Sequence, residues 1–241
     1  MINLNKSSLF TVLLVTINLC HFSCKSSHNK LTSNSSITQY ASFNADTTTF
    51  QFKNGDILFQ DLDCGDLCDA IEKVTHGIAG KSFSHIGLVY LRNDSTYIIE
   101  AIGKCVQLTL LNTFMNRSVV NNDKNKIIVG RLIAKYQQLN DSALQFALSK
   151  IGTPYDEAFI YNNQKYYCSE LIYDAYKFAN YNKPFFQLEP MTFKDPSTGE
   201  TFPAWTKYYS DLKTPIPERQ LGCNPAGISR SHHINIVKSF Y

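Results

Sequence analysis

Alternating hydrophobic and polar positions predict strands in the first half of the chain. Residues 84–91 and 96–101 are rich in β-branched and aromatic side chains, and the turn at residues 92–95 joins them into an antiparallel hairpin. A second hairpin is expected within residues 49–59, where the alternation lies on both sides of an Asn-Gly dipeptide. Two further strands are expected at residues 106–110 and 127–132.

A helical period replaces this alternation in other segments. One helix is expected to begin at Asp66, and a second is expected to be capped by Asn140. A third begins near Cys168, where apolar residues recur three and four positions apart, and a short helix is expected at residues 111–116. Residues 181–241 are rich in proline and aromatic residues and are expected to be mostly loops. The fold class that follows is α+β, with a mostly antiparallel sheet and helices on one side of it.

The composition indicates a globular domain that follows a flexible segment. Of the 241 residues, 44% are hydrophobic, which is enough for a core and excludes a wholly disordered chain. Residues 24–48 are rich in Ser, Thr and Asn and are expected to form a flexible tether. Residues 49–241 then form a single domain, whose last part, residues 181–241, is a loop-rich C-terminal extension.

Charge and glycine patterns argue against two classes of function. The 23 Lys and Arg residues against 20 Asp and Glu residues give a net charge of +3, which is weak and evenly spread, so nucleic acid is not expected as a partner. Neither glycine-rich phosphate-binding pattern, GxGxxG or GxxxxGK followed by Ser or Thr, occurs in the chain. Nucleotide chemistry is therefore not expected.

The N-terminal segment has the pattern of an export signal. A short positive start is followed by an apolar stretch at residues 9–19, which is shorter than the about 18 residues that span a bilayer. The segment resembles a bacterial lipoprotein signal, in which a small residue, here Ser23, precedes an acylated cysteine, although His21 replaces the usual leucine. We therefore expect residues 1–23 to be a signal peptide and Cys24 to anchor an exported lipoprotein to a membrane of the bacterial cell envelope. Simple secretion, with Cys24 as an ordinary thiol, is the alternative.

Four cysteines remain after Cys20, Cys24 and Cys168 are set aside. They allow two disulfides in any of three connectivities outside the cytoplasm. The nearest pair is separated by three residues, which is not the spacing of a zinc knuckle, and no second Cys/His pair completes a metal site with His76. We expect buried thiols or a local disulfide, and no metal. These four cysteines are Cys64, Cys68, Cys105 and Cys223.

Cys168 is the candidate nucleophile because of its position at the start of a helix. The free N–H groups and the positive end of the helix dipole stabilise a thiolate there. A thiolate is the nucleophile that a cysteine hydrolase requires. The alternative is that Cys168 is a small buried hydrophobic residue on a packed helix face, which is the commoner fate of a lone cysteine.

His85 and Glu100 are brought together by the predicted hairpin. If Arg92 pairs with Ser95 across a two-residue turn, His85 and Glu100 become diagonal neighbours on one side of the sheet, where Gly87 leaves room for their contact. A turn of odd length would place them on opposite sides. A carboxylate among apolar residues needs a partner, and one beside an imidazole fixes its tautomer and raises its basicity.

Five stretches of the sequence together resemble the circularly permuted papain-fold hydrolases of the NlpC superfamily, the YiiX/YaeF-like group. In these enzymes the histidine and its acidic partner precede the cysteine, as they do here. The resemblance implies a permuted papain-like fold with Cys168 as nucleophile, His85 as general base, Glu100 as the orienting residue and Tyr155 lining the active site near the oxyanion. Two motifs of the relatives that cut cell walls are missing, which weakens an assignment to peptidoglycan stem peptides. The matching stretches are residues 54–59, 84–88, 99–101, 152–156 and 167–171.

Three functions remain open from the sequence. The leading hypothesis is a cell-envelope thiol hydrolase that cleaves an amide bond in a peptide, a peptidoglycan stem peptide or an N-acyl amide, with no metal or organic cofactor. The second is a lipoprotein of the same fold that binds a lipid or peptide without turnover, and the third is a redox protein that uses Cys64 and Cys68. The aromatic residues that would line a binding pocket, unless they cover the core, are Phe185, Phe186, Phe193, Phe202, Trp205, Tyr208 and Tyr209.

Overall fold

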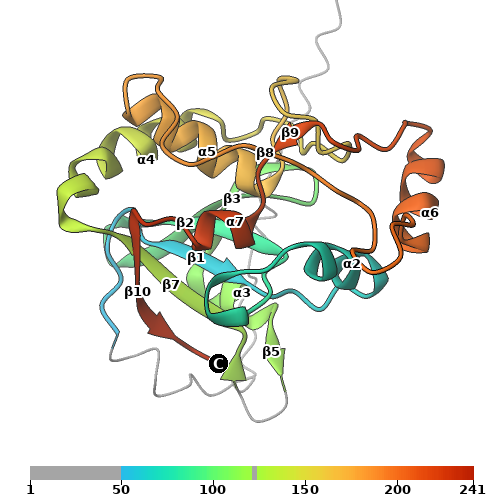
Figure 1. The fold of residues 1–241 in the computed structure, drawn as a ribbon. Coiled ribbons are helices and arrows are strands. Elements are labelled where there is room, and N and C mark those ends of the chain that lie inside the picture. The colour runs from blue at the N-terminus through green and yellow to red at the C-terminus, as the bar shows by residue number, and fades with distance from the viewer. Residues whose placement is uncertain (1–49, 121–123) are drawn as a thin grey trace, which may run out of the picture.

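The centre of the fold is a six-stranded antiparallel sheet. The computed structural model describes residues 50–120 and 124–241. The sheet strands are β1 (Ile57–Gln60), β2 (His85–Arg92), β3 (Ser95–Ile102), β4 (Cys105–Leu110), β7 (Ile127–Leu132) and β10 (Ile234–Ser239). Their order across the sheet is β10-β7-β1-β2-β3-β4, and every neighbouring pair is antiparallel (Figure 1). The predicted α+β class is confirmed.

Six α-helices surround the sheet in the described part of the chain. They are α2 (Asp66–Val74), α3 (Leu111–Asn116), α4 (Asn140–Ser149), α5 (Cys168–Ala179), α6 (Pro203–Leu212) and α7 (Pro225–Ser229). Shorter elements are the 3₁₀ turns η1 (Ile78–Gly80) and η2 (Ala134–Leu139) and the two-residue strands β5 (Val119–Val120), β6 (Lys124–Asn125), β8 (Glu189–Pro190) and β9 (Leu221–Gly222). Among the residues described, no helix has the length and apolar character that a membrane span requires.

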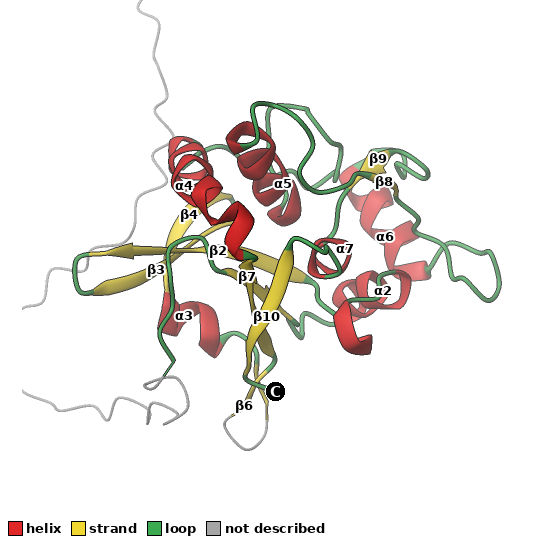
Figure 2. Ribbon diagram, turned by 60° about the vertical axis from the view of Figure 1, so that its left-hand side comes forward, coloured by secondary structure: helices red, strands yellow, loops and turns green. Residues whose placement is uncertain are grey.

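Helices pack on both faces of the sheet, which corrects the prediction of helices on one side only. The larger core lies between one face and the helices α4, α5 and α7 (Figure 2). The smaller core lies on the opposite face, where α3 contributes Phe114 and Met115. Because strand residues alternate between the faces, Ile57 and Phe59 belong to the first core and Leu58 belongs to the second.

The hairpin predicted within residues 49–59 is wrong. Strand β1 is a single strand that pairs with β2 on one side and β7 on the other, so both of its edges are already occupied. Asn54 still lies in a turn, but its side chain accepts a hydrogen bond from Leu91 N, which ties the turn to β2. Phe50 and Phe52, which were expected to form the first strand of this hairpin, instead pack against the smaller core.

The C-terminal segment is rich in loops, as predicted, but it is not an extension added to the domain. It contains α6, α7 and β10, and β10 forms an edge of the main sheet by pairing with β7. Ile234 contributes to the larger core, while its neighbour Asn235 is exposed, as is usual for a strand with one face on the core. Residues 181–241 are therefore an integral part of the domain.

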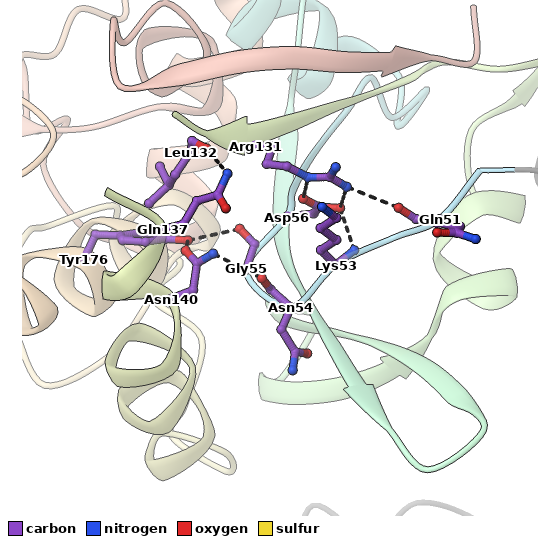
Figure 3. Close-up of polar contacts among 10 residues, drawn as sticks. All are labelled: Gln51, Lys53, Asn54, Gly55, Asp56, Arg131, Leu132, Gln137, Asn140 and Tyr176. Atoms are coloured by element: carbon purple, nitrogen blue, oxygen red, sulfur yellow. Dashed lines mark hydrogen bonds and ion pairs between the residues drawn. The ribbon is translucent and has the colours of Figure 1, made fainter. Parts of the chain in front are cut away.

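A polar network joins the start of β1 to α4 and α5 (Figure 3). Asn140 was predicted to cap α4, but Leu139 precedes the helix, and the Asn140 amide instead donates to Asn54 O at 3.1 Å. The Tyr176 hydroxyl lies 3.0 Å from Asn140 Oδ1 and 3.1 Å from Gly55 O. The network replaces the cap: it holds the turn before β1 against two helices.

Substituting Tyr176→Phe should lower the free energy of unfolding by about 1–2 kcal/mol, because the buried hydroxyl is removed and its acceptors lose a donor. Tyr181→Phe is the matched control, because that side chain is 85% exposed and should leave stability unchanged. Urea unfolding of both variants measures the difference. Equal stability of the two variants would contradict the structural role of the network.

Candidate active site

Cys168 is the first residue of α5, as predicted, and is 6% exposed. Two contacts with the segment around Cys223 hold the start of the helix. The Tyr167 hydroxyl accepts a hydrogen bond from Cys223 N at 3.2 Å, and Ser169 Oγ donates to Cys223 O at 2.9 Å. The sequence therefore fixes the thiol at a helix N-terminus, where the backbone N–H groups of the first turn have no acceptor within the helix.

The predicted register of the β2–β3 hairpin is confirmed. Arg92 pairs with Ser95 across the turn, which places His85 and Glu100 on the same face of the sheet. His85 Nε2 lies 2.6 Å from Glu100 Oε2. The imidazole is 4% exposed and the carboxylate residue is fully buried. The pair is thus a hydrogen-bonded imidazole and carboxylate shielded from water.

The charge states of this pair follow from its surroundings. Burial lowers the pKa of His85, but hydrogen bonds with Cys168 and Glu100, together with the negative charge of Glu100, raise it to about 9. Burial raises the pKa of Glu100, but the hydrogen bond and charge of His85 and the charge of Arg117 hold it below its usual value. At neutral pH the imidazole is therefore protonated and the carboxylate ionised.

The helix that carries Cys168 packs against the face of the sheet opposite to the one that carries His85 and Glu100. Ile86 and Leu88 belong to the core beneath α5, whereas Val89, on the same face as His85, belongs to the core beside α3. Because successive residues of a strand point to opposite faces, the body of α5 packs away from the face of His85. Cys168 and His85 are each the first residue of their element, so they meet at the N-terminal ends of α5 and β2.

Arg117 is a partner of Glu100 that the sequence reasoning missed. Its Nη2 lies 2.7 Å from both carboxylate oxygens of Glu100. The guanidinium also lies over the ring of Phe114, with 4.9 Å between its Cζ and the ring centroid. The available signal was Glu100 itself, because a buried carboxylate has two oxygens and one imidazole does not satisfy both.

Gly87 leaves room for α3 rather than for the contact between His85 and Glu100. A Cβ at Gly87 would collide with Ile98 Cγ2 and would come within 3.2 Å of Phe114 Cε2. The Phe114 ring in turn lies 5.8 Å from the imidazole of His85, measured between centroids. The glycine therefore allows a ring from α3 to pack beneath the histidine.

A cavity of about 290 Å³ opens beside Cys168. Its wall includes residues of α2 and of the C-terminal part of the chain. Among them are Phe193 and Trp205, which also pack with Tyr209 in a small core cluster, so these two side chains both line the cavity and cover a core. Phe185 and Phe186 instead belong to the larger core. The apolar side chains that line the cavity are Ile71, Val74, Phe159, Met191, Phe193 and Trp205.

Tyr155 lies near the site but is not among the residues that line this cavity. Its ring packs edge to face against Phe159, with 6.3 Å between the ring centroids. Burial raises the pKa of Tyr155 well above its usual value near 10, and negative charge on Cys168 adds to this effect. The phenol therefore remains protonated and able to donate a hydrogen bond.

Among the described cysteines, Cys64 and Cys68 form one disulfide, Cys105 is also disulfide-bonded, and Cys168 and Cys223 are free thiols. Cys64 and Cys68 form a disulfide at the start of α2, so these two sulfurs bond to each other and not to a metal. Cys223 is a buried free thiol, which excludes the arrangement of two disulfides among the four cysteines considered. The expected signal peptide, tether and lipidation site at Cys24 lie outside the described residues.

Comparisons with known proteins agree with this geometry. Residues 51–238 match the family model described as "Permuted papain-like amidase enzyme, YaeF/YiiX, C92 family". The chain is 30% identical over 135 residues to the uncharacterized protein YiiX of Escherichia coli strain K12, a match that covers 54% of this chain and 60% of YiiX. The match thus spans less than two thirds of the length of that relative.

A solved structure is similar over most of the chain. The crystal structure of the metalloprotein yiiX from Escherichia coli O157:H7 gives a TM-score of 0.62, covering 79% of this chain and 98% of that one. The sequence identity is 22%, so the likeness shows a shared fold.

The charge of His85 should make stability depend on pH. Its pKa is raised from 6.5 to about 9 on folding, so its stabilisation is fully present below 6.5 and is lost as pH rises through 9. The shift corresponds to about 3 kcal/mol of unfolding free energy. Urea unfolding of wild type and His85→Gln should show a gap near pH 6 that shrinks by this order near pH 10. A gap that stays constant over this range would contradict the assigned charge state.

Proposed function

Because the chain belongs to the family of permuted papain-like amidases of the YaeF/YiiX type, we propose that it is a thiol hydrolase that cleaves an amide bond with Cys168, His85 and Glu100. The supporting observation is the chain of contacts from thiol to imidazole to buried carboxylate. A thiol, a base and an orienting carboxylate are the parts that nucleophilic acyl transfer requires.

The first half of the reaction forms an acyl-enzyme. Sγ of Cys168, as the thiolate, attacks the carbonyl carbon of the substrate and forms a C–S bond. The protonated imidazole of His85 gives its proton to the amide nitrogen as the C–N bond breaks, and the amine leaves. Glu100 keeps the imidazole oriented through its bond to Nε2.

The second half returns the enzyme to its starting state. A water molecule attacks the thioester carbonyl while the neutral imidazole takes one of its protons. The C–S bond breaks, the carboxylic acid leaves, and the thiolate and imidazolium are restored. The same steps serve an ester, with an alcohol as the leaving group.

Two donors are proposed for the oxyanion that forms on the carbonyl. The backbone N–H of Cys168 belongs to the first turn of α5, where no helical acceptor is available. The hydroxyl of Tyr155 is the second, because burial keeps it protonated and the negative charge of Cys168 is felt there. Tyr155 does not itself line the cavity, but its ring packs against Phe159, which does.

The apolar cavity favours a substrate with an apolar acyl group. Aromatic and aliphatic side chains line it beside Cys168, and a group that enters it would gain from leaving water. An N-acyl amide or a peptide with a large apolar side chain meets this requirement better than the polar stem peptides of cell walls.

Metal chemistry is not part of the proposed mechanism. The relative from Escherichia coli O157:H7 was solved as a metalloprotein. In this chain, within residues 50–120 and 124–241, no group of three or more His, Cys, Asp or Glu side chains could hold a metal ion. The donor set present does not fit a resident metal, and the prediction that none is needed remains a prediction.

Hydrolysis of a panel of N-acyl anilides of increasing chain length tests the proposal. Cys168→Ala should lower kcat/KM by about a thousandfold or more, because the nucleophile is lost. Tyr181→Phe is the control, since this side chain is 85% exposed and does not line the cavity, and the variant should keep activity within about twofold. Acylation of the wild type, observed as added mass on the peptide that contains Cys168, would identify the intermediate.

A binding protein on the same fold is the second candidate, and the apolar cavity is the observation that favours it. A binder would retain the acyl amide in wild type and in Cys168→Ala with equal affinity and without cleavage. Turnover by the wild type that is absent in Cys168→Ala would exclude this candidate. No cleavage of any substrate in the panel, with tight binding, would overturn the hydrolase.

We also propose that the domain is tethered to a membrane through a lipid on Cys24. The apolar stretch at residues 9–19, the Ser23–Cys24 pair and the polar residues that follow support this proposal. Intact-mass analysis of natively expressed protein should show a chain that begins at Cys24 and carries acyl groups. An unmodified Cys24, or cleavage at another position, would show that the anchor proposal is wrong.

A further inference from the structure

The buried carboxylate of Glu100 has more partners than the proposed triad uses. His85 from β2 bonds Oε2, Thr109 from β4 provides a further hydrogen bond, and Arg117 contacts both oxygens. In the part of the chain that the structure describes, no other acidic group forms an ion pair with Arg117. The arginine is thus committed to this carboxylate.

We infer that Arg117 is a positioning residue of the proposed reaction, which holds the Glu100 carboxylate in place and in its charged form beneath His85. This inference rests on the proposed function. It adds to the triad a residue that acts on the chemistry through Glu100 and His85 and does not touch the substrate.

Burial of Glu100 makes a permanent cation necessary. A carboxylate that is removed from water and left without a partner takes up a proton. His85 carries a positive charge only while it is protonated, and during the reaction it gives up one of its protons. The guanidinium of Arg117 stays charged throughout, so it keeps Glu100 ionised at the step when His85 is neutral.

Arg117 is itself held rigidly from β1. Its backbone N–H donates to Phe114 O at 3.3 Å, which closes the turn after α3. The buried amide of Gln60 donates to Phe114 O at 2.7 Å and to Ser118 Oγ at 3.1 Å. Gln60 also pairs with His85 across the sheet. Strand β1 therefore holds the turn that contains Arg117 close to His85.

A second arginine, Arg131 of strand β7, provides the comparison. Arg131 bonds the buried carboxylate of Asp56 at 2.6 and 2.7 Å, as tightly as Arg117 bonds Glu100 (Figure 3). Asp56 contacts no imidazole, so this second pair has a structural role alone. Substitutions in the two pairs can therefore be compared: both remove a buried ion pair, but only a substitution of Arg117 also removes support for His85.

The test is the rate at which iodoacetamide alkylates Cys168 in the full chain, followed by mass spectrometry of its peptide near pH 6 and near pH 9. Without Arg117, Glu100 should protonate at a higher pH, and the thiolate–imidazolium pair should be weaker in acid. Arg117→Ala should therefore lower the rate near pH 6 by at least about fivefold and leave the rate near pH 9 within about twofold.

Three further variants test how Arg117 acts. Glu100→Gln should lower the rate near pH 6 to a similar extent, and Arg117→Ala added to it should change the rate by less than about twofold. Arg117→Lys should recover most of the loss, because a cation is restored. Arg131→Ala should be alkylated at the wild-type rate at both pH values. Circular dichroism shows whether this variant is folded, and Arg131→Lys replaces it if it is not.

Different results would overturn different claims. The role of Arg117 would be overturned if Arg117→Ala reacted as fast as the wild type near pH 6, or if it lost rate equally at both pH values. It would also be overturned if Arg117→Lys recovered none of the loss, or if Arg117→Ala had its full effect in the Glu100→Gln background. A wild-type rate near pH 6 that is unchanged in His85→Ala would overturn the proposed function, and this inference with it.

Discussion

A fully buried carboxylate in the third strand of the sheet is the constraint on which the site depends. Glu100 is surrounded by apolar strand residues and has no exposed surface. A charge in that position is stable only where neighbours supply hydrogen bonds and positive charge. The register of β2 and β3 supplies His85, and the turn after α3 supplies Arg117. The need of Glu100 for hydrogen bonds and positive charge thus explains why β2 and the turn after α3 meet at this side chain.

The sheet separates Cys168 from the groups that support His85. The body of α5 packs on one face, while Glu100, Arg117 and Phe114 lie on the other. Contact between the two halves is possible because His85 and Cys168 stand at the ends of their elements. One consequence is a division of roles. The face beneath α3 sets the charge of the imidazole, and residues of α2 and α6 shape the cavity that opens beside the thiol.

Local patterns in the sequence predicted the parts of the site that local geometry controls. A two-residue turn fixes the pairing of β2 with β3, so the contact between His85 and Glu100 follows from the sequence alone. Contacts between distant segments were not predictable in this way. Strand β10 pairs with β7, which lies about a hundred residues earlier in the chain. No hairpin turn links the two strands, so the short alternating pattern of β10 does not indicate its partner. Arg117 follows a short helix and has no periodic pattern, and Asn140 has the sequence of a cap but bonds Asn54 and Tyr176 instead.

The disulfide at the start of α2 gives the domain two sulfur sites with opposite chemical needs. The role proposed for Cys168 requires a free thiol, and a reductant protects that thiol from oxidation. The same reductant attacks the bond between Cys64 and Cys68, which closes the first turn of the helix that supplies Ile71 and Val74 to the cavity wall. Redox conditions therefore act on two different properties of one domain. Oxidation would consume the thiol of Cys168, and reduction would loosen part of the wall of the cavity that opens beside it.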